Sequence, residues 1–483
     1  MRPGPIFKVL GTLLMFFSIT MLTPIIVDWI YHENNAFPFL FGFIVTLGSG
    51  LILFIISSRS KKQLTIKDGF IVVLAIWSVL GLYGSIPYMY SNGLHLGFSD
   101  AVFESISGFT TTGATVIHGL DYLPKSILYY RQQSQLLGGM GIIILSVAIL
   151  PMLGVGGMQL YRAEANGPWK ENKLTPKIAD TAKVLWLIYL LLVVLCMLSY
   201  RVAGMDWFNA ISFSFSTIGT GGFAPTDASM AGQTPIIYII CIFFMMISAT
   251  SFALHFSAFR KLSVRVYWRD PEFRAYIFFA FSMAVIVILT LISQSVESSN
   301  HVAFWDGLFQ VASFVSNTGF TSNSNYHEWP LFLPILLMVI GLIGGCAGSS
   351  SGGLKIVRAV LIRKQAFREA RRLVHPTGVF PVKFGNKVMS ESVMSSVWGF
   401  VAAYFMLFIV LWLALMGFGV PTTTAFSAVA ACISNLGPGL GEVGVNYASL
   451  PTAVHWILNL AMLIGRLEVF TVVVLFTSDF WRR

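Results

Sequence analysis

Charged residues are scarce in this chain: Asp, Glu, Lys and Arg make up 11% of its 483 residues. Soluble domains carry roughly a quarter of their residues as charges, so the composition excludes an ordinary soluble enzyme. Hydrophobic residues instead make up 56% of the sequence, and the mean hydropathy is +0.76. Apolar stretches long enough to cross about 30 Å of hydrocarbon recur along the chain. The sequence therefore predicts a polytopic membrane protein.

Cysteine and histidine are too scattered to build a reactive site. The cysteines stand singly in apolar segments, without metal-ligand or disulfide spacing, and we interpret them as small buried hydrophobic residues: Cys196, Cys241, Cys346 and Cys432. Six of the eight histidines are scattered and form no metal-binding or nucleophilic constellation: His118, His255, His301, His327, His375 and His455. The sequence also lacks a Rossmann or P-loop nucleotide-binding domain. We therefore expect no enzyme and no covalent cofactor.

Positive charges are unevenly distributed along the chain, and their pattern indicates topology. Most of the 31 lysines and arginines fall into six clusters, and the positive-inside rule places all six on the cytoplasmic side. The net charge of +10 therefore reflects topology, and we expect no nucleic-acid partner. The clusters are Arg2/Lys8, Arg59–Lys67, Arg162–Lys183, Arg260–Arg274, Lys355–Lys387 and Arg482/Arg483.

Ten apolar segments between these clusters are predicted to span the membrane, with both termini in the cytoplasm. The first continues to Ile30 without a small-residue cleavage site, so we interpret it as a retained helix and not as a signal peptide. The predicted spans are 5–30, 36–58, 68–90, 126–158, 184–203, 234–259, 275–294, 331–360, 395–418 and 452–480.

A half-length apolar segment followed by a glycine-containing loop lies between the two spans of each of the last four pairs. Such a segment is too short to span, so we expect a re-entrant pore helix and an extended loop, which membranes tolerate only where protein or water surrounds them. An ungapped alignment on one glycine gives Asp100–Gly113, Asp206–Gly219, Asp306–Gly319 and Thr424–Gly437. Repeats of about 100 residues predict pseudo-symmetry around a shared axis. Chance similarity among glycine-rich loops is the weaker interpretation, because all four segments lie on the same side.

Two further properties recur in the aligned segments. A residue suited to cap a helix stands thirteen positions before each glycine: Asp100, Asp206, Asp306 and Thr424. A hydroxyl residue stands three positions before each glycine: Thr110, Ser216, Ser316 and Ser434. We expect these hydroxyls, and the amides beside them, to brace the loops from behind.

The four loops are suited to bind a dehydrated cation, which needs oxygen ligands such as rings of backbone carbonyls. Glycine readily adopts the backbone angles that aim successive carbonyls at an axis. A pore helix whose C-terminus points at that axis adds its negative dipole end. Ligation by the backbone also explains how Ile and Leu occupy equivalent positions. The predicted cation-binding residues are Thr111, Thr112, Gly113, Thr217, Ile218, Gly219, Asn317, Thr318, Gly319, Asn435, Leu436 and Gly437.

This pattern resembles the Trk/Ktr/HKT superfamily of cation transporters, whose four repeats each carry one filter glycine. The resemblance covers nearly the whole chain, and the two additional N-terminal spans are similar to the Trk membrane subunits (TrkH/TrkG type). It implies an all-α membrane fold of four pseudo-symmetric helix–pore loop–helix repeats around one ion pore. Glycine at all four positions implies potassium as the substrate, taken up across the bacterial inner membrane. The implied units are a two-helix extension, 1–62, and repeats 63–165, 166–265, 266–388 and 389–483.

A glycine- and serine-rich segment interrupts the span at 331–360, although these residues are poor helix formers. One interpretation is a nucleotide P-loop, but its Gly-Lys-Ser/Thr ending is missing. Another is close helix packing through small residues, which also applies to Gly138-Gly139 at the matching offset in the first repeat. The resemblance implies a third, an intramembrane loop that obstructs the path beneath the filter. Its residues are Gly344, Gly345, Gly348, Ser349, Ser350, Ser351, Gly352, Gly353 and Lys355.

Arg466 is the second candidate gate residue, because it lies inside the last apolar span. A charge at mid-bilayer costs about 2.5–3.5 kcal/mol on insertion scales, so its side chain should face protein or water. A structural role, in which it pairs with Glu468 or with loop carbonyls, stays open. The functional interpretation is a fixed positive charge under the filter that raises the barrier to cations. The resemblance, which has an arginine here, favours the gate.

The resemblance also implies partners. These are a separate cytosolic ring of NAD- or ATP-binding regulatory subunits of the TrkA type, which would carry the nucleotide, a second copy of this chain in a homodimer, and membrane lipid. The basic stretch Lys355–Lys387 is a cytoplasmic anchor that could dock such a regulator. The main functional alternative is a secondary cation transporter, coupled to sodium or protons, with a midplane site between inverted repeats. Four repeats that enter from one side favour the pore, and both channel-like and proton-coupled uptake stay open.

Overall fold

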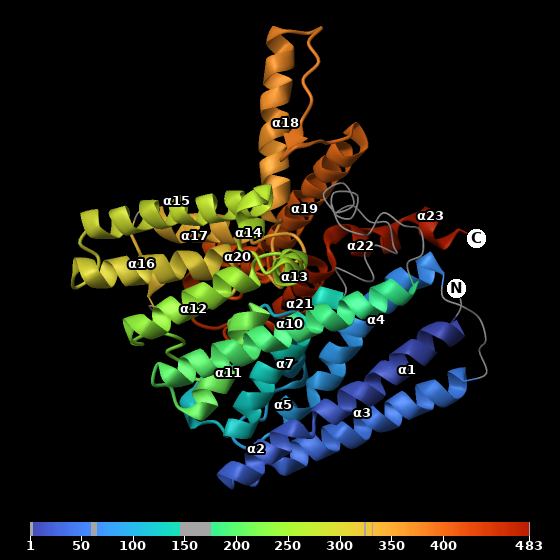
Figure 1. Cartoon of the computed structure of the whole chain (residues 1–483). Helices are drawn as coiled ribbons and strands as arrows, with labels where there is room; N and C mark the ends of the chain where they lie inside the picture. Colours follow the sequence, from blue (N-terminus) through green and yellow to red (C-terminus); the bar gives the residue numbers. More distant parts are fainter. Residues whose placement is uncertain (1–2, 59–64, 145–174, 323–324, 331, 483) are drawn as a thin grey trace.

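The structure, a computed structural model, describes residues 3–58, 65–144, 175–322, 325–330 and 332–482. Helices dominate it (Figure 1). Its described strands are a short antiparallel pair, β1 (Lys383–Phe384) and β2 (Lys387–Val388), in which Lys383 faces Val388. The predicted all-α membrane fold is confirmed.

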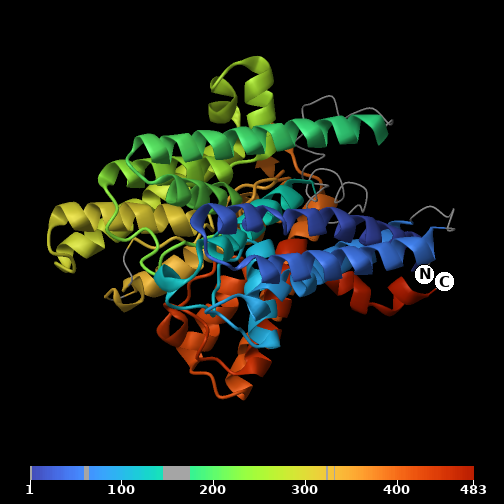
Figure 2. The ribbon, with the colours of Figure 1, turned by 90° about the horizontal axis from the view of Figure 1, so that it is seen from below.

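The N-terminal extension comprises three helices: α1 (Pro3–Thr20), α2 (Thr23–Tyr31) and α3 (Ala36–Ser57). Helices α1 and α2 together form one candidate membrane span, and α3 forms the next. Helix α1 packs along α3, and both run beside each other in two views (Figures 1 and 2). This agrees with the two predicted N-terminal spans, 5–30 and 36–58.

Each of the four repeats has a long first helix, a pore helix and a second helix. The first helices are α4 (Ile66–Gly84, followed by α5, Ile86–Tyr90), α10 (Thr175–Val202), α15 (Pro271–Ser293) and α19 (Glu391–Gly417). The pore helices are α6 (Phe98–Phe109), α11 (Trp207–Gly219), α16 (Asn300–Val315) and α20 (Thr422–Ile433). The second helices begin with α7 (Lys125–Ile144), α12 (Pro235–Ser248), α17 (Leu333–Ile343) and α21 (Thr452–Leu467).

Short elements complete the repeats. In the loops after the pore helices lie η1 (Leu120–Tyr122), η4 (Tyr326–Glu328) and η5 (Gly441–Val443). After the second helices lie α13 (Phe252–Lys261), α14 (Arg265–Arg269), α18 (Ile356–Val374), α22 (Val469–Val473), η6 (Val474–Phe476) and α23 (Ser478–Trp481).

Pore helices and second helices alternate in a closed ring. Helix α6 packs against α7, α7 against α11, α11 against α12, and α12 against α16. The ring continues from α16 to α17, from α17 to α20 and from α20 to α21. Helix α21 packs against α6 and so closes the ring. Each first helix covers the pore helix of its own repeat from outside. The ring therefore has the pseudo-four-fold plan that the internal repeats predicted.

The second helices differ from the continuous spans that the sequence predicted. Six described helices or helix pairs are long and apolar enough to cross a membrane: α1–α2, α3, α4–α5, α10, α15 and α19. Helices α12 and α13, predicted as one span at 234–259, meet at 97°, and α21 and α22, within 452–480, meet at 113°. Helix α17 ends at Ile343, midway along the span predicted at 331–360. The end of the span predicted at 126–158 lies outside the described residues.

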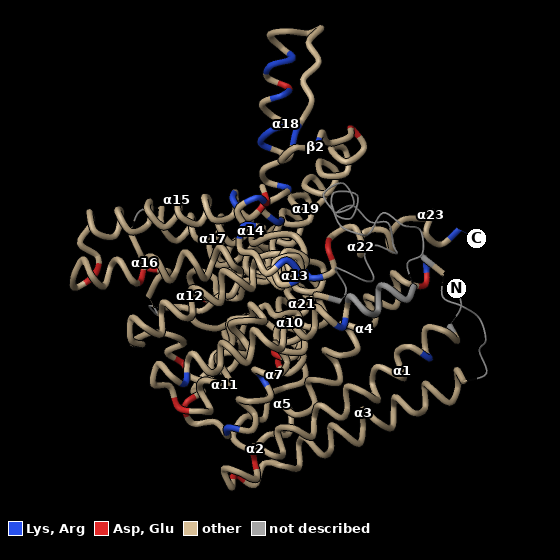
Figure 3. Tube along the Cα trace, in the orientation of Figure 1, with Lys and Arg blue, Asp and Glu red and all other residues tan. Residues whose placement is uncertain are grey.

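Helix α18 extends away from the other helices and transverse to the long ones (Figure 1). It is amphipathic, and its buried residues include Val357 and Leu361, which pack with Phe384 and Met389 of the strand hairpin. Lysines and arginines gather along it (Figure 3). This is the basic stretch predicted at Lys355–Lys387.

Candidate functional site

The four pore helices end in the same unusual backbone conformation. In each repeat, a residue one or two positions after the end of the pore helix has a left-handed φ. The values are 48° at Thr111, 50° at Thr220, 54° at Asn317 and 51° at Asn435. This is costly for a residue with a β-carbon, above all for threonine, and such strain is typical of functional sites. The N–H of the next residue donates to the carbonyl five residues back, over 2.8–3.0 Å, from Thr112, Gly221, Thr318 and Leu436.

A glycine with positive φ follows in every repeat, and these four residues, Gly113, Gly222, Gly319 and Gly437, are called here the glycine ring. Their φ values are 83°, 76°, 82° and 96°. Each packs against the carbonyl oxygen that precedes the glycine of the next repeat, with which an added Cβ would overlap. Gly221 O lies against Gly113, Thr318 O against Gly222, Leu436 O against Gly319, and Thr112 O against Gly437. The contacts close a circle, so both sterics and φ require glycine.

The structure corrects the predicted register of the second repeat. Gly219, aligned with the other ring glycines from sequence, is the last residue of α11 and packs against the carbonyl of Gln135. Thr217 Oγ1 hydrogen-bonds the hydroxyl of Tyr200 at 2.9 Å, and the Ile218 carbonyl accepts from Ser350 Oγ at 3.2 Å. Thr217, Ile218 and Gly219 therefore lie in the pore helix, and Thr220, Gly221 and Gly222 take the predicted filter positions.

The three-residue error also explains the capping residues. Asp206 caps α11, as predicted, and accepts from the N–H of Asn209 at 3.1 Å. It stands sixteen residues before Gly222, as Gly97 and Pro421, the N-caps of α6 and α20, stand before Gly113 and Gly437. The predicted caps Asp100, Asp306 and Thr424 are wrong, because all three lie inside their helices. Residues three positions apart lie on the same face of a helix, so the apolar pattern of α11 fits either register.

Hydroxyls and amides lie behind the ring, where the sequence placed them. Thr110 Oγ1 pairs with Thr112 Oγ1 at 2.7 Å, and Ser316 Oγ with Thr318 Oγ1 at 2.8 Å. Asn435 Nδ2 donates to Thr112 Oγ1 at 3.0 Å and so joins the fourth repeat to the first. The corresponding Asn317 Nδ2 donates to Gly341 O at 2.7 Å and to Ser434 O at 3.0 Å.

Gln135 of α7 supports the second-repeat loop, and sequence reasoning missed it. Its Nε2 donates to the Gly221 carbonyl at 2.6 Å, and its Oε1 accepts from the N–H of Phe223 at 3.1 Å. The signal for this loop in the sequence was the adjacent pair Gly221-Gly222 after Thr220, which fits the Thr-x-Gly pattern of Thr111–Gly113 as well as Thr217–Gly219 does.

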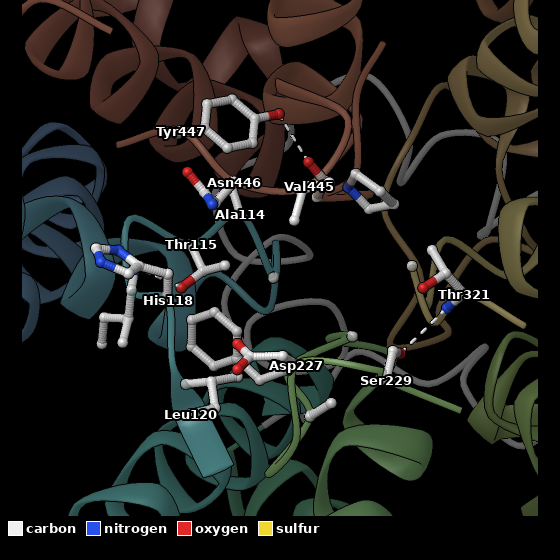
Figure 4. A pocket seen from close by; sticks show the side chains of 18 of the residues that line it. Ala114, Thr115, His118, Leu120, Asp227, Ser229, Thr321, Val445, Asn446 and Tyr447 are labelled. Carbon is white, nitrogen blue, oxygen red and sulfur yellow. Dashed lines mark hydrogen bonds between the residues drawn. The ribbon is translucent and has the colours of Figure 1, made fainter. Parts of the chain in front are cut away.

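A cavity of about 330 Å³ opens directly above the glycine ring and is lined by all four of its glycines. Figure 4 shows lining side chains from every repeat, among them Thr115, Asp227, Thr321 and Tyr447. Asp227 contributes a carboxylate, and the Tyr447 hydroxyl donates to the Gly437 carbonyl at 2.7 Å. The loops that follow the four glycines thus enclose one shared space.

The glycine–serine loop, residues 344–355, lies on the other side of the ring. It contacts the ends of three pore helices: Ser350 Oγ donates to the Ile218 carbonyl, Ser351 Oγ to Asn317 Oδ1 at 3.3 Å, and Gly352 packs against the Ser434 carbonyl. Gly344 begins the loop with φ 73° and ψ −169°, a conformation essentially restricted to glycine. The predicted interruption of the span at Gly344 is therefore present.

The loop is held by backbone from the break in the second repeat. The N–H of Cys346 donates to the Ala249 carbonyl at 2.9 Å, and the N–H of Phe252 donates to the Gly348 carbonyl at 3.0 Å. Ser350 Oγ also donates to the Ser248 carbonyl at 3.0 Å. The break between α12 and α13 and the loop therefore satisfy each other's polar groups.

Arg466 is buried in the last turn of α21, and it reaches the same loop. Its Nη1 donates to the Ser350 carbonyl at 3.0 Å, while Nε and Nη2 have no partner among the described residues. Glu468 does not pair with it, because that carboxylate accepts from Arg358 Nη2 at 2.9 Å. Lys355 Nζ donates to the Ser351 carbonyl. Of the structural partners predicted for Arg466, the loop carbonyl is present and Glu468 is not.

Gly138 and Gly139 lie within α7, which continues unbroken to Ile144. A Cβ on Gly138 would overlap the Phe109 carbonyl, and one on Gly139 would meet Gly219 Cα at 3.0 Å. The pair therefore allows α7 to approach two pore helices closely, which is the packing interpretation.

Comparison with known proteins shows which proteins this chain is similar to. A family model described as TrkH, cation transport protein, matches residues 36–483. The Trk system potassium uptake protein TrkH of Escherichia coli K12 is 49% identical over 98% of both chains. That of Vibrio parahaemolyticus is 47% identical over 99% of both chains. A crystal structure of the potassium transporter TrkH from Vibrio parahaemolyticus covers 100% of both chains, with 44% identity and a TM-score of 0.93.

Proposed function

This chain belongs to the TrkH family of cation transport proteins, and we propose that it takes up potassium across the bacterial inner membrane through the glycine ring. The observation that carries the proposal is the closed circle in which the carbonyls of Thr112, Gly221, Thr318 and Leu436 each lie against the next glycine. Rings of backbone carbonyls replace the hydration shell of a potassium ion. The relatives named as potassium uptake proteins support potassium as the ion.

The filter we propose differs from the sequence prediction only in the second repeat. It consists of Thr111–Gly113, Thr220–Gly222, Asn317–Gly319 and Asn435–Gly437. The C-terminal ends of four pore helices converge there, and their dipoles favour a cation. The cavity lined by Asp227 would receive ions before they enter the ring.

The gate we propose comprises the glycine–serine loop and Arg466, on the side of the ring opposite the cavity. The loop contacts three of the four pore-helix ends, and Arg466 adds a buried positive charge bound to it. An uncompensated charge in a low-dielectric path repels a cation. Opening would require the loop to leave the contacts that hold it, above all those of Ser350.

The remaining assignments are part of the same proposal. We place both termini and the basic helix α18 in the cytoplasm by the positive-inside rule. The units are the extension 1–62 and repeats 63–165, 166–265, 266–388 and 389–483. A cytosolic nucleotide-binding ring of the TrkA type would act as regulator of a homodimer, and this chain itself would carry no enzymatic activity.

Ion flux into liposomes tests the function. Purified protein should pass potassium and rubidium faster than sodium, because the ring offers carbonyl oxygens at fixed spacing. Equal flux of all three ions would contradict a potassium filter. The same assay with an imposed proton gradient separates the two modes of uptake: a gradient-driven accumulation of potassium indicates proton-coupled transport, and no response indicates a channel.

A further inference from the structure

A buried ion pair lies behind the glycine ring in the first repeat. Glu104 of α6 and Arg131 of α7 are 0% and 1% exposed, and Arg131 Nη2 lies 2.8 Å from Glu104 Oε1. Two charges buried this deeply are retained only where further hydrogen bonds satisfy them. Neither residue belongs to the filter or the gate described above, so the pair needs its own explanation.

Both side chains bind the segments that leave the ring. Glu104 accepts from the N–H of Val116 and from Thr115 Oγ1, each at 3.0 Å. Arg131 Nη1 crosses to the second repeat and donates to the Ala224 carbonyl at 3.1 Å. Its guanidinium also lies over the ring of Phe223, 4.2 Å from the centroid. The pair therefore ties together the loops that follow Gly113 and Gly222.

The position of Glu104 follows a rule common to the repeats. In three of them a pore-helix side chain accepts the N–H of the third residue after the ring glycine. Glu104 Oε2 accepts from Val116 at 3.0 Å, Gln310 Oε1 from Ser322 at 3.3 Å, and Ser427 Oγ from Leu440 at 2.8 Å.

The second repeat is the exception, and Arg131 substitutes for the missing brace. The third residue after Gly222 is Pro225, which has no N–H to donate. The pore-helix position equivalent to Glu104 is Phe213, which packs against Phe320. Arg131 instead reaches the carbonyl one residue earlier, at Ala224. The first repeat therefore supports the outer loop of the second.

We propose that Glu104 and Arg131 are positioning residues of the filter, and that their ion pair sets its discrimination between potassium and sodium. The inference rests on the proposed function. Filter geometry depends on the outer loops, because Thr115 also accepts through its carbonyl from the N–H of Tyr447 at 2.8 Å, and the Tyr447 hydroxyl binds the Gly437 carbonyl. The pair thus connects loops of the first, second and fourth repeats. Fixing those loops keeps the ring carbonyls at the spacing that suits the larger ion.

The pair also cancels the positive charge of Arg131 at the mouth of the pore. Arg131 lines the cavity above the ring, so its charge would repel entering cations if Glu104 were neutral. We therefore expect Glu104→Gln alone to reduce potassium flux more than the double variant Glu104→Gln/Arg131→Gln, and the difference to shrink as ionic strength rises. Because an unpaired buried arginine also destabilises the fold, the fluxes are compared at equal amounts of folded protein, where a purely structural role would leave the two variants alike.

The decisive experiment compares the potassium-to-sodium flux ratio of full-length protein in liposomes. The double variant should still transport potassium, because it loses one charge of each sign and its net charge is unchanged. Its potassium-to-sodium flux ratio should fall about fivefold, because the loops are no longer fixed. Arg131→Lys should also lower the ratio, because one ammonium cannot reach Glu104 and Ala224 together as the guanidinium fork does. The control is Arg201→Gln, which removes an arginine on α10 that binds the Met205 carbonyl away from the ring.

The outcomes separate the two proposals. A wild-type protein that does not discriminate between the ions would contradict the potassium filter itself. A selective wild type with a double variant of unchanged ratio would overturn the positioning role. If the double variant does not elute as a single species in detergent, Arg131→Lys decides, since it keeps a positive charge beside Glu104 but cannot also reach the Ala224 carbonyl. An unchanged ratio in that variant would likewise overturn the proposal.

Discussion

Gly222 is the residue on which the proposed filter register of the second repeat depends. We expect Gly222→Ala to lower the potassium-to-sodium flux ratio about tenfold, which corresponds to about 1.4 kcal/mol of differential binding. The new methyl group would overlap the Thr318 carbonyl at a φ of 76°, so a ring oxygen must move. Flux measured in liposomes for both ions gives the ratio.

Two glycines provide matched controls for that substitution. Gly232→Ala has the same strain, with φ 75°, but no atom lies within 4 Å of its Cβ, so selectivity should stay unchanged. Gly219→Ala would crowd the Gln135 carbonyl at 2.9 Å without a positive φ, and should cost stability more than selectivity. A ratio that falls for Gly219→Ala and not for Gly222→Ala would restore the register predicted from sequence.

At the scale of elements, the long first helices were predictable and the second helices were not. The spans predicted at 36–58 and 395–418 agree closely with α3 (Ala36–Ser57) and α19 (Glu391–Gly417), because their apolar composition is a local property. The interruption at Gly344 was also predicted, because glycines mark it in the sequence. The break after Ser248 was not, because no glycine or proline marks it and the loop of another repeat satisfies its backbone groups.

The same limit applies to the candidate site. Three of the four glycines aligned from sequence, Gly113, Gly319 and Gly437, lie in the glycine ring, and the sequence indicated the loop and Arg466 as separate features. Their contact through the Ser350 carbonyl could not be read from residues 116 positions apart. The Glu104–Arg131 pair was missed because a single Glu and a single Arg in apolar segments carry no local pattern.

Ser350 is the best point at which to test the loop as a gate. Its single O–H lies within hydrogen-bonding distance of the carbonyls of Ile218 and Ser248, so Ser350→Ala removes one shared hydrogen bond, worth about 1 kcal/mol. We expect potassium flux to rise severalfold, because the loop then leaves the path more often. Tracer uptake by liposomes at equal protein content measures the change.

Ser349→Ala is the matched control, because among the described residues the Ser349 hydroxyl donates to the Cys346 carbonyl within the same loop. Its flux should stay near that of the wild type. Unchanged flux in Ser350→Ala, with expression intact, would argue that the loop packs against the pore helices without obstructing them.

At the scale of the whole molecule, the N-terminal extension is joined to the pore by polar contacts. The Glu33 carboxylate accepts from the N–H groups of Lys125 at 2.5 Å and Ser126 at 3.0 Å, at the start of α7. Thr23 Oγ1 donates to Gln133 Oε1 of the same helix at 2.8 Å. The extension therefore caps the second helix of the first repeat, whose N-terminal N–H groups otherwise lack partners.

Glu33→Ala should lower the free energy of unfolding by about 1 kcal/mol, the typical value of a lost cap. The negative charge also interacts favourably with the positive end of α7. Thermal unfolding in detergent measures the effect, and Glu442→Ala, at an exposed carboxylate of the fourth repeat, serves as control. Equal unfolding midpoints for the two variants would mean that the Glu33 cap does not stabilise the fold.

The circle of contacts in the glycine ring has a direction. For each ring glycine, the atoms nearest to an added Cβ belong to the repeat that follows it. A side chain added at Gly113 would displace the carbonyl of Gly221. The adjacent residue, Gly222, would then move against the carbonyl of Thr318. Substitutions in adjacent repeats should therefore be epistatic, whereas those in opposite repeats should add. A four-part ring encoded in one gene is consequently less free to diverge, quarter by quarter, than its four separate sequences suggest.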